Sequence, residues 1–329
     1  MSKQHSAIVK GIAILLMLVC HFPFLCGYET LGHSVASFLA SISHPIQYFM
    51  VVSGYGLYYA YSQDRLSWPY LLKRTGRLYV SFWLVLAIFV FGLGYCLLGE
   101  FHYDEALTHF TNIIGWRWDY CQFTWFLLTY VLLTFCSKWI FRGIERTGNL
   151  WAVIITFVVS IAMQWVISRY YLTYLRYHYF AYHPILVIQQ SFSFTVGAVM
   201  ARLTLSGKEI TWNWLKGKNL VVVLFIAIAF ALRGLTFVSI IPFFPIIIIW
   251  LVLHINPGAV SRYVFIPLGD KSMMMWFAHG FIGPVLLKDY YLVFKWPALI
   301  WLAWVIISFA VSCLLIPVSN RISKALKLY

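Results

Sequence analysis

Long apolar runs recur from one end of this chain to the other, and they restrict its fold more than any other feature. A helix needs about 20 apolar residues to cross the hydrocarbon core of a membrane. Stretches of this kind lie at residues 7–26, 36–61, 78–98, 124–141, 150–168, 185–204, 219–235, 237–255, 271–288 and 297–318. A segment in lipid must satisfy its own backbone hydrogen bonds, which a helix does. We therefore expect an all-α polytopic membrane protein with about ten transmembrane helices.

The composition agrees with a protein that lies mostly in lipid. Hydrophobic residues make up 62% of the chain, charged residues make up 10%, and the mean hydropathy is +0.81. Soluble domains contain about 25% charged residues. We see no low-complexity tract, no linker rich in Pro or Gly and no internal repeat. The sequence thus predicts a single integral-membrane domain over residues 1–329, without a soluble extracytoplasmic domain.

The distribution of basic residues predicts the orientation, because cytoplasmic loops carry an excess of Lys and Arg. With the N-terminus in the cytoplasm, all but six of the 24 Lys and Arg residues fall on that side. The six on the outer side are Arg117, Arg169, Arg176, Arg233, Lys288 and Lys295. We expect both termini in the cytoplasm. The net charge of +14 then reflects topology, and no nucleic-acid partner is implied.

The first apolar run follows the basic residue Lys3, as the core of a cleaved signal peptide would. No small-x-small cleavage site follows His21, and Pro23-Phe24-Leu25 is a poor one. We therefore expect this run to remain as the first transmembrane helix.

Two ionisable residues, Lys10 and His21, lie within that first apolar run. A helix turns by about 100° and rises by about 1.5 Å per residue, so eleven steps return to nearly the same face, about 16 Å further along. Each residue alone has an ordinary explanation, Lys10 as an interfacial anchor and His21 as a satisfied interior histidine. Ionisable groups at this depth usually face the protein interior or a wet cavity and serve a function. Their shared face makes the pair our first candidate site.

Three cations, Lys73, Arg74 and Arg77, lie at the start of the third predicted span. Positive-inside anchoring would explain one or two of them. Three within five residues also make a plausible site for an anion such as a phosphate.

Two further stretches contain small or ionisable residues inside predicted spans. Ser53 and Gly54 form a small step in the second span, which predicts close helix packing. His279 follows Trp276 deep in the ninth span and has the same two explanations as His21.

The six cysteines lie at positions 20, 26, 96, 121, 136 and 313 and show no metal-ligand spacing. We expect no metal site. Cys96 and Cys121 both fall near the outer face and could pair, although we favour buried free thiols.

Taken together, these motifs resemble the membrane acyltransferase-3 family, bacterial O-acyltransferases that modify cell-surface sugars. The resemblance rests on five segments: Lys10-Gly11-Ile12-Ala13 with His21, Phe49 to Tyr55, Arg74 to Val80, Trp125-Phe126-Leu127, and Leu268 to His279. It runs from residue 5 to about residue 285. Three details depart from the family pattern: Lys10 replaces the usual arginine, Val80 replaces a proline, and the segment from Phe49 is one residue longer.

The resemblance implies transfer of an acyl group, expected to be acetyl, from cytoplasmic acyl-CoA to a hydroxyl of an extracytoplasmic sugar. Acyl-CoA would be a co-substrate, with no bound cofactor. His21 would be the general base, or less favourably a transient acyl carrier, and Lys10 would assist it. The donor phosphates would bind Lys73, Arg74 and Arg77. Ser53, Trp276 and His279 would line the pocket or the acceptor side, and no oxyanion donor is evident.

The same resemblance implies a multi-pass protein of the bacterial cytoplasmic membrane. Its partners would be membrane lipid and a cell-surface glycan or lipid-linked sugar, and self-association is left open. Two other classes fit the composition. A polysaccharide-precursor flippase or small-molecule transporter would also be basic and multi-spanning, but it would not need the cytoplasmic arginine pair. A non-enzymatic scaffold would not need His21.

Overall fold

A computed structural model describes residues 1–27, 31–99, 101, 105–235, 243–286, 288–291 and 293–329. Within these residues the chain forms helices and turns and no strands. The first half contains α1 (Lys3–Cys26), α3 (His33–Ile42), α4 (Pro45–Ser62), α5 (Trp68–Val85) with a π-helical continuation (Leu86–Leu98), α6 (Ala106–Ile113), α7 (Phe126–Thr147) and α8 (Asn149–Tyr170). The second half contains α9 (Tyr179–Leu205), α10 (Asn219–Leu235), α11 (Phe243–Val252), α12 (Ile266–Gly280), α13 (Lys288–Tyr291) and α14 (Pro297–Ala325). Short 3₁₀ turns cover Gln122–Thr124 and Leu175–Tyr177, and π-helical segments flank α12 at Ser261–Phe265 and Phe281–Val285.

Seven helical segments of the described chain are long and apolar enough to cross a membrane. They lie at Lys3–Cys26, His33–Ser62, Trp68–Cys96, Gln122–Thr147, Asn149–Tyr170, Tyr179–Leu205 and Pro297–Ala325. Two shorter apolar helices cover Asn219–Gly234 and Phe243–Val252. The all-α, multi-spanning class predicted from the sequence is confirmed. Residues 237–242 of the eighth predicted span and residue 287 of the ninth lie outside the described residues.

The second predicted span, 36–61, is divided into two helices. α3 ends at Ile42, and α4 begins at Pro45 after His44, whose φ of −136° and ψ of 63° are not helical. The residue before a proline is pushed away from the helical region, because the proline ring clashes with its backbone and Cβ. The chain therefore breaks inside a segment that its hydropathy alone presents as continuous.

The ninth span also differs, because its helix begins earlier than residue 271. The π-helical segment starts at Ser261 and continues into α12, so the stretch before residue 271 is helical. Proline is tolerated in the first turn of a helix, and Pro267 lies there in α12.

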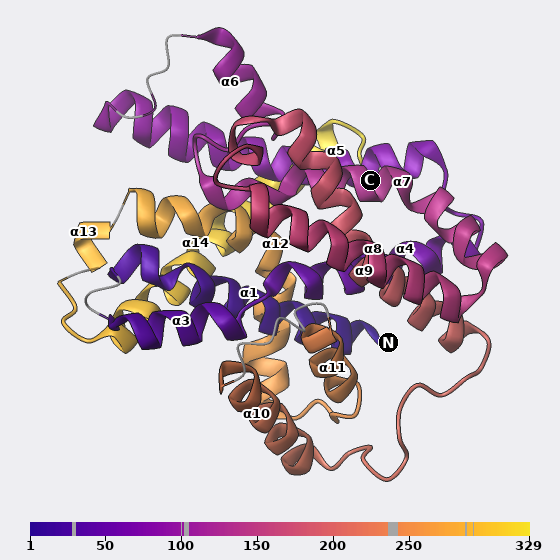
Figure 1. The fold of residues 1–329 in the computed structure, drawn as a ribbon. Coiled ribbons are helices and arrows are strands. Elements are labelled where there is room, and N and C mark those ends of the chain that lie inside the picture. Colours follow the sequence, from indigo (N-terminus) through magenta and orange to yellow (C-terminus); the bar gives the residue numbers. More distant parts are fainter. Residues whose placement is uncertain (28–30, 100, 102–104, 236–242, 287, 292) are drawn as a thin grey trace.

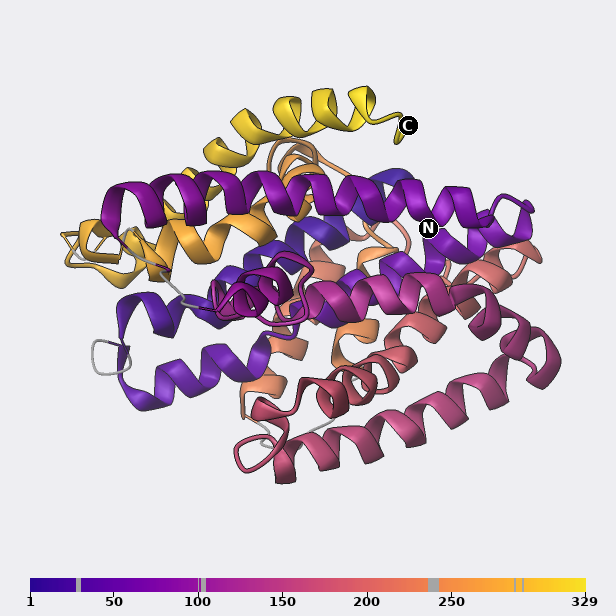
Figure 2. The ribbon, with the colours of Figure 1, turned by 90° about the horizontal axis from the view of Figure 1, so that it is seen from above.

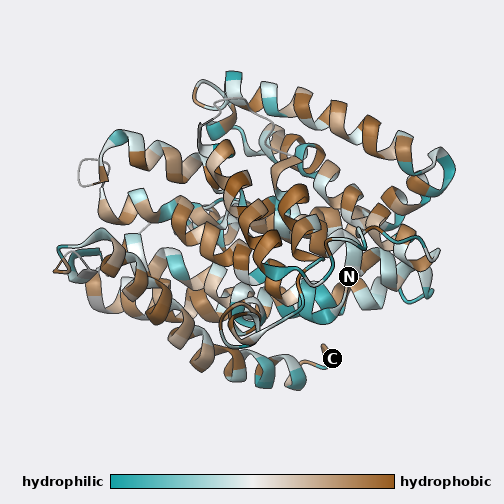
Figure 3. Ribbon diagram, turned by 90° about the horizontal axis from the view of Figure 1, so that it is seen from below, coloured by the Kyte–Doolittle hydropathy of each residue, from teal (hydrophilic) through white to brown (hydrophobic). Residues whose placement is uncertain are grey.

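α1 runs through the middle of the bundle (Figure 1). It contacts α12, α4, α14 and α3, and α4 in turn packs along α9. Figure 2 shows α8 along one side of the molecule and α14 along the opposite side. Hydrophobic residues cover most of the helices, and hydrophilic ones gather around the two termini and in loops (Figure 3). The segment of α1 that carries Lys10 and His21 is therefore central.

Glycines let the backbones of α1 and α12 touch. A Cβ built on Gly11 would lie 2.1 Å from the carbonyl oxygen of Phe265, and one on Gly269 would lie 1.9 Å from that of Ala7. Neither contact leaves room for a side chain. Gly54 meets α9 in the same way, 2.0 Å from the carbonyl oxygen of Phe194, so the predicted close packing at Ser53-Gly54 is confirmed.

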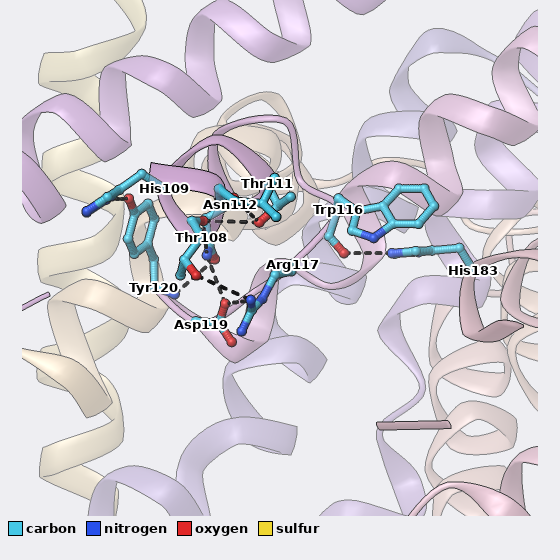
Figure 4. A network of polar contacts seen from close by, with 10 residues as sticks. Thr108, His109, Thr111, Asn112, Trp116, Arg117, Asp119, Tyr120 and His183 are labelled. Atoms are coloured by element: carbon cyan, nitrogen blue, oxygen red, sulfur yellow. Dashed lines mark hydrogen bonds and ion pairs between the residues drawn. The ribbon is translucent and has the colours of Figure 1, made fainter. Parts of the chain in front are cut away.

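The loop before α7 is ordered by one amide (Figure 4). Asn112 donates from Nδ2 to Asp119 at 2.9 Å and accepts at Oδ1 from the backbone N–H of Tyr120 at 3.2 Å. Arg117 pairs with Asp119 at 2.7 Å. His183 of α9 donates from Nε2 to the carbonyl oxygen of Trp116 at 2.7 Å. These bonds fix the chain that leads into Phe123 and α7.

Candidate active site

The first candidate pair, Lys10 and His21, lies along one side of α1 and faces two cavities. An inner cavity of about 480 Å³ is lined by Lys10, and an outer cavity of about 330 Å³ is lined by His21. The two cavities have Phe126 and Trp276 in common. The two residues that the helical spacing placed on one face therefore line two neighbouring cavities, which Phe126 and Trp276 separate.

The inner cavity collects polar groups from five helices, α1, α4, α5, α7 and α12. Its lining comprises Ser6, Lys10, Phe49, Val52, Ser53, Gly56, Arg74, Leu78, Phe126, Tyr130, Gly269, Asp270, Ser272, Met273 and Trp276. A neighbouring cavity of about 520 Å³ begins at Met1 and shares Lys10, Ser6 and Asp270 with it. The two cavities adjoin one another between the N-terminal end of α1 and Trp276.

Arg74 reaches this cavity and is held by a tyrosine. Its Nη2 donates to the hydroxyl of Tyr130 at 2.8 Å, and Ser53 donates to the same hydroxyl at 3.4 Å. The Nε of Arg74 is buried and has no hydrogen-bond partner among the described residues. A buried donor without a partner is costly. The guanidinium therefore offers an unused N–H at a site that also contains Lys10.

Lys73 and Arg77 do not line the inner cavity. Lys73 donates from Nζ to the backbone oxygen of Tyr329 at 2.8 Å, and the guanidinium of Arg77 lies 5.0 Å from the centre of the Tyr329 ring. Residues four apart share a helix face, whereas Arg74 is turned about 100° from Lys73. The three predicted donor-binding cations are consequently split between two places.

The other predicted lining residues are also distributed differently. Ser53 lines the inner cavity and not the outer one. His279 is fully buried and lines neither cavity, whereas Trp276 lines both.

His279 instead lies directly behind His21. Nδ1 of His279 lies 2.7 Å from the carbonyl oxygen of Trp276, so this nitrogen carries a proton and donates. In a neutral ring Nε2 is then an acceptor, and it lies 2.9 Å from Nδ1 of His21. His21 therefore donates from Nδ1 and keeps the lone pair on Nε2. Among the described residues Nε2 of His21 has no hydrogen-bond partner, which is the form a general base needs.

Aromatic packing holds the two imidazoles in place. Their rings are nearly parallel, with centroids 5.1 Å apart, and the Phe123 ring lies 4.1 Å from that of His21. Trp304, fully buried on α14, donates from Nε1 to the backbone oxygen of His279 at 3.0 Å. Phe123 follows Tyr120 of the ordered loop before α7 by three residues, so the loop also contributes to the position of His21.

The partition between the cavities is formed by Phe126 and Trp276. Their ring centroids are 5.7 Å apart, and Trp276 donates from Nε1 to the backbone oxygen of Phe123 at 3.2 Å. Phe126 belongs to the Trp125-Phe126-Leu127 motif at the start of α7. The two rings therefore lie between the cavity lined by Lys10 and the cavity lined by His21.

The outer cavity contains groups that sequence reasoning missed. It is lined by His44, Pro45, Ile46 and Gln47 at the break between α3 and α4, and by Gln164, Gln189 and Gln190 of α8 and α9. The dipeptide His44-Pro45 was a visible signal for the break. The glutamines gave none, because they come from helices far apart in the sequence.

Other candidate features lie elsewhere. A cleft of about 650 Å³ between α6 and the start of α9 is lined by Arg117, Arg176 and aromatic side chains and contains none of the predicted site residues. No group of three or more His, Cys, Asp or Glu in the described part of the chain could hold a metal ion. Cys96 is exposed, Cys121 is buried, and both are free thiols.

A family model described as an acyltransferase domain, that of the acyltransferase-3 family, matches residues 7–317. The chain belongs to the acyltransferase-3 family. Comparison with curated proteins and with solved structures gives no match. Family membership and the apolar helices together make the chain a multi-pass membrane acyltransferase. The matched region contains Lys10, His21, Arg74 and His279.

Proposed function

We propose that this acyltransferase-3 protein moves an acetyl group from cytoplasmic acetyl-CoA to a hydroxyl of an extracytoplasmic sugar. One observation carries the proposal: a cation-lined inner cavity and a histidine-lined outer cavity meet at Phe126 and Trp276. Donor and acceptor can then approach one point from opposite sides of the membrane.

The direction of transfer rests on the orientation proposed from basic residues. With the N-terminus in the cytoplasm and about ten crossings, Lys10 and Arg74 lie toward the cytoplasmic ends of α1 and α5. His21 lies further along α1, toward the outside. The bacterial cytoplasmic membrane is the location that supplies acetyl-CoA on one side and surface glycan on the other.

The donor would occupy the inner cavity and its neighbour at Met1. Arg74 suits an anion because its Nε has no partner among the described residues and its planar guanidinium can hydrogen-bond two oxygens at once. Lys10 has an ammonium group, which acts as a point charge. Asp270 lines the same cavities and would limit how many anionic oxygens approach. Lys73 and Arg77 remain proposed donor contacts, which would act outside the inner cavity beside Tyr329.

In the proposed reaction, Nε2 of His21 accepts the proton of the acceptor hydroxyl while its oxygen attacks the thioester carbonyl. The new C–O bond forms, the C–S bond breaks, and the imidazolium returns the proton to the departing thiolate. The products are the acetyl ester and free CoA thiol. His279 keeps Nδ1 of His21 protonated and oriented throughout. We favour this direct transfer over an acyl-histidine intermediate, because His44 at the helix break is the only base besides His21 among the described residues that line the outer cavity.

The test uses purified protein in detergent, so that both sides are accessible. [14C]Acetyl-CoA is the donor, and the acceptor is the strain's own surface glycan after mild alkaline deacylation. Wild type should place base-labile label on the glycan, and His21→Ala should reduce the rate by about 10²- to 10⁴-fold while remaining monodisperse. A wild-type protein that binds acetyl-CoA but transfers no label to any glycan fraction would refute the proposed acceptor class.

A further inference from the structure

Four glutamine side chains line the outer cavity, and they come from three different helices. Gln47 is on α4, Gln164 is on α8, and Gln189 and Gln190 are on α9. Primary amides are costly to bury in a membrane unless they find partners. Four amides beside His21 therefore require an explanation, either in helix packing or in the binding of a ligand.

Helix packing accounts for part of the cluster. Gln189 donates from Nε2 to Oε1 of Gln164 at 2.8 Å, which joins α9 to α8. Gln190 donates in turn from Nε2 to Oε1 of Gln189. Interhelical amide bonds of this kind are a common means of association in membranes.

Two polar groups are left over, and both belong to cavity-lining residues. Oε1 of Gln190 is buried and accepts no hydrogen bond within the described chain, and Gln190 is only 3% exposed. Gln47 is 8% exposed, and its side-chain amide has no hydrogen-bond partner among the described residues. Packing does not explain these groups, because neither is used to join helices. Gln190 offers one acceptor, its Oε1, and Gln47 offers a whole amide, with two N–H donors and one acceptor oxygen.

The rest of the lining defines the ligand's charge. The described residues that line the outer cavity include no Asp, Glu, Lys or Arg. Its other walls include the aromatic side chains of Trp125, Phe126 and Tyr182. A charged group placed here would be desolvated without an ion-pair partner, at a high cost in free energy. Hydroxyl groups, which both donate and accept, match free amides, and aromatic rings match the C–H faces of a sugar ring.

We propose that Gln47 and Gln190 form the acceptor subsite and select an uncharged sugar ring, whose hydroxyls they hydrogen-bond beside His21. The cavity of about 330 Å³ is at the small end of ligand sites, which run from about 300 to 1,000 Å³, so one ring occupies it. The subsite rests on the proposed function, since it presents a sugar hydroxyl to Nε2 of His21.

The experiment measures steady-state kinetics with [14C]acetyl-CoA and the alkali-deacylated surface glycan as acceptor. Gln47→Leu and Gln190→Leu should each raise the acceptor KM about five- to tenfold, since each loses a hydrogen bond to the sugar. The donor KM should stay within twofold of wild type. The matched control is Gln63→Leu, at the C-cap of the helix that carries Gln47, which is exposed, does not line the cavity and should behave as wild type.

Gln47→Leu keeps the test independent of folding. The Gln47 side chain has no hydrogen-bond partner in the described part of the chain, so this change removes no hydrogen bond seen there, unlike Gln190→Leu, which also frees Gln189. An acceptor KM within twofold of wild type for both variants overturns the subsite, and so does an equal rise in donor and acceptor KM. NMR of the product should place the ester on a neutral sugar residue, and an ester on a uronic acid or other anionic unit refutes the selection of an uncharged ring. No transfer by the wild type would instead refute the proposed function itself.

Discussion

Nδ1 of His21 and Nε2 of His279 lie 2.9 Å apart, although 258 positions separate the two residues in the chain. Because the backbone oxygen of Trp276 fixes the proton on the far nitrogen of His279, the direction of the bond is determined. His279 is thus a positioning residue that selects the tautomer of the candidate base.

His279→Leu should lower kcat by about 10- to 100-fold with little change in the KM of acetyl-CoA, since only the orientation of His21 is lost. His279→Gln should recover much of the rate, because its amide can donate to the carbonyl of Trp276 and accept from His21. If the leucine and glutamine variants have the same kcat, the side chain acts through packing alone. Steady-state kinetics on both proteins decides between these outcomes.

Lys10 lines the inner cavity, where a positive charge should assist the donor. We expect Lys10→Arg to retain substantial activity and Lys10→Met to lose most of it and to bind acetyl-CoA more weakly. Equilibrium binding of the labelled donor to purified protein provides the measurement. An active Lys10→Met protein with unchanged donor affinity would show that Lys10 is an interfacial anchor.

The two arginines of the third span should differ from each other. Arg74→Ala should weaken acetyl-CoA binding by about tenfold or more, because a charge-assisted contact at a largely buried site is lost. Arg77→Ala should have a smaller effect, because Arg77 packs on Tyr329 outside the inner cavity. Donor-binding isotherms for the two variants test the order, and equal weakening would place both arginines on the donor.

Trp276 should keep the donor thioester from water on the outer side. Trp276→Leu replaces one of the two rings in the partition with a smaller side chain. We therefore expect faster hydrolysis of acetyl-CoA, with release of free thiol, in the absence of acceptor. Trp139→Leu is the control, since Trp139 is 58% exposed and far from either cavity lining. A thiol-release assay with no increase above wild type would show that the partition does not exclude water.

The cysteines near the outer face should react differently with maleimide. Burial raises the pKa of the Cys121 thiol to about 12, so little reactive thiolate forms at neutral pH. Cys96 is exposed and should be labelled. Mass spectrometry of labelled peptides gives the readout, with Cys96→Ser as the control. Labelling of Cys96 only after reduction would reveal a disulfide.

The sequence predicted the helical class and the Lys10–His21 face, because apolar length and helical period are local properties. The split of the cations was not evident from the spacing, because Arg77 can share a helix face with Lys73, four residues before it, and with Arg74, three residues before it. The break at His44-Pro45 was overlooked because hydropathy averages across it. The contact of His21 with His279 and the meeting of the four glutamines depend on packing between distant helices, which no local pattern reports.

The bare backbones at Gly11 and Gly269 have a consequence for the chemistry further along the same two helices. α1 and α12 touch there without intervening side chains, and the imidazole pair joins the same two helices further along. Any side chain introduced at Gly269 would wedge the helices apart at one end and tilt them at the other. The distance between Nδ1 of His21 and Nε2 of His279 in the middle of the membrane therefore depends, in part, on Gly269, a residue that has no side chain at all.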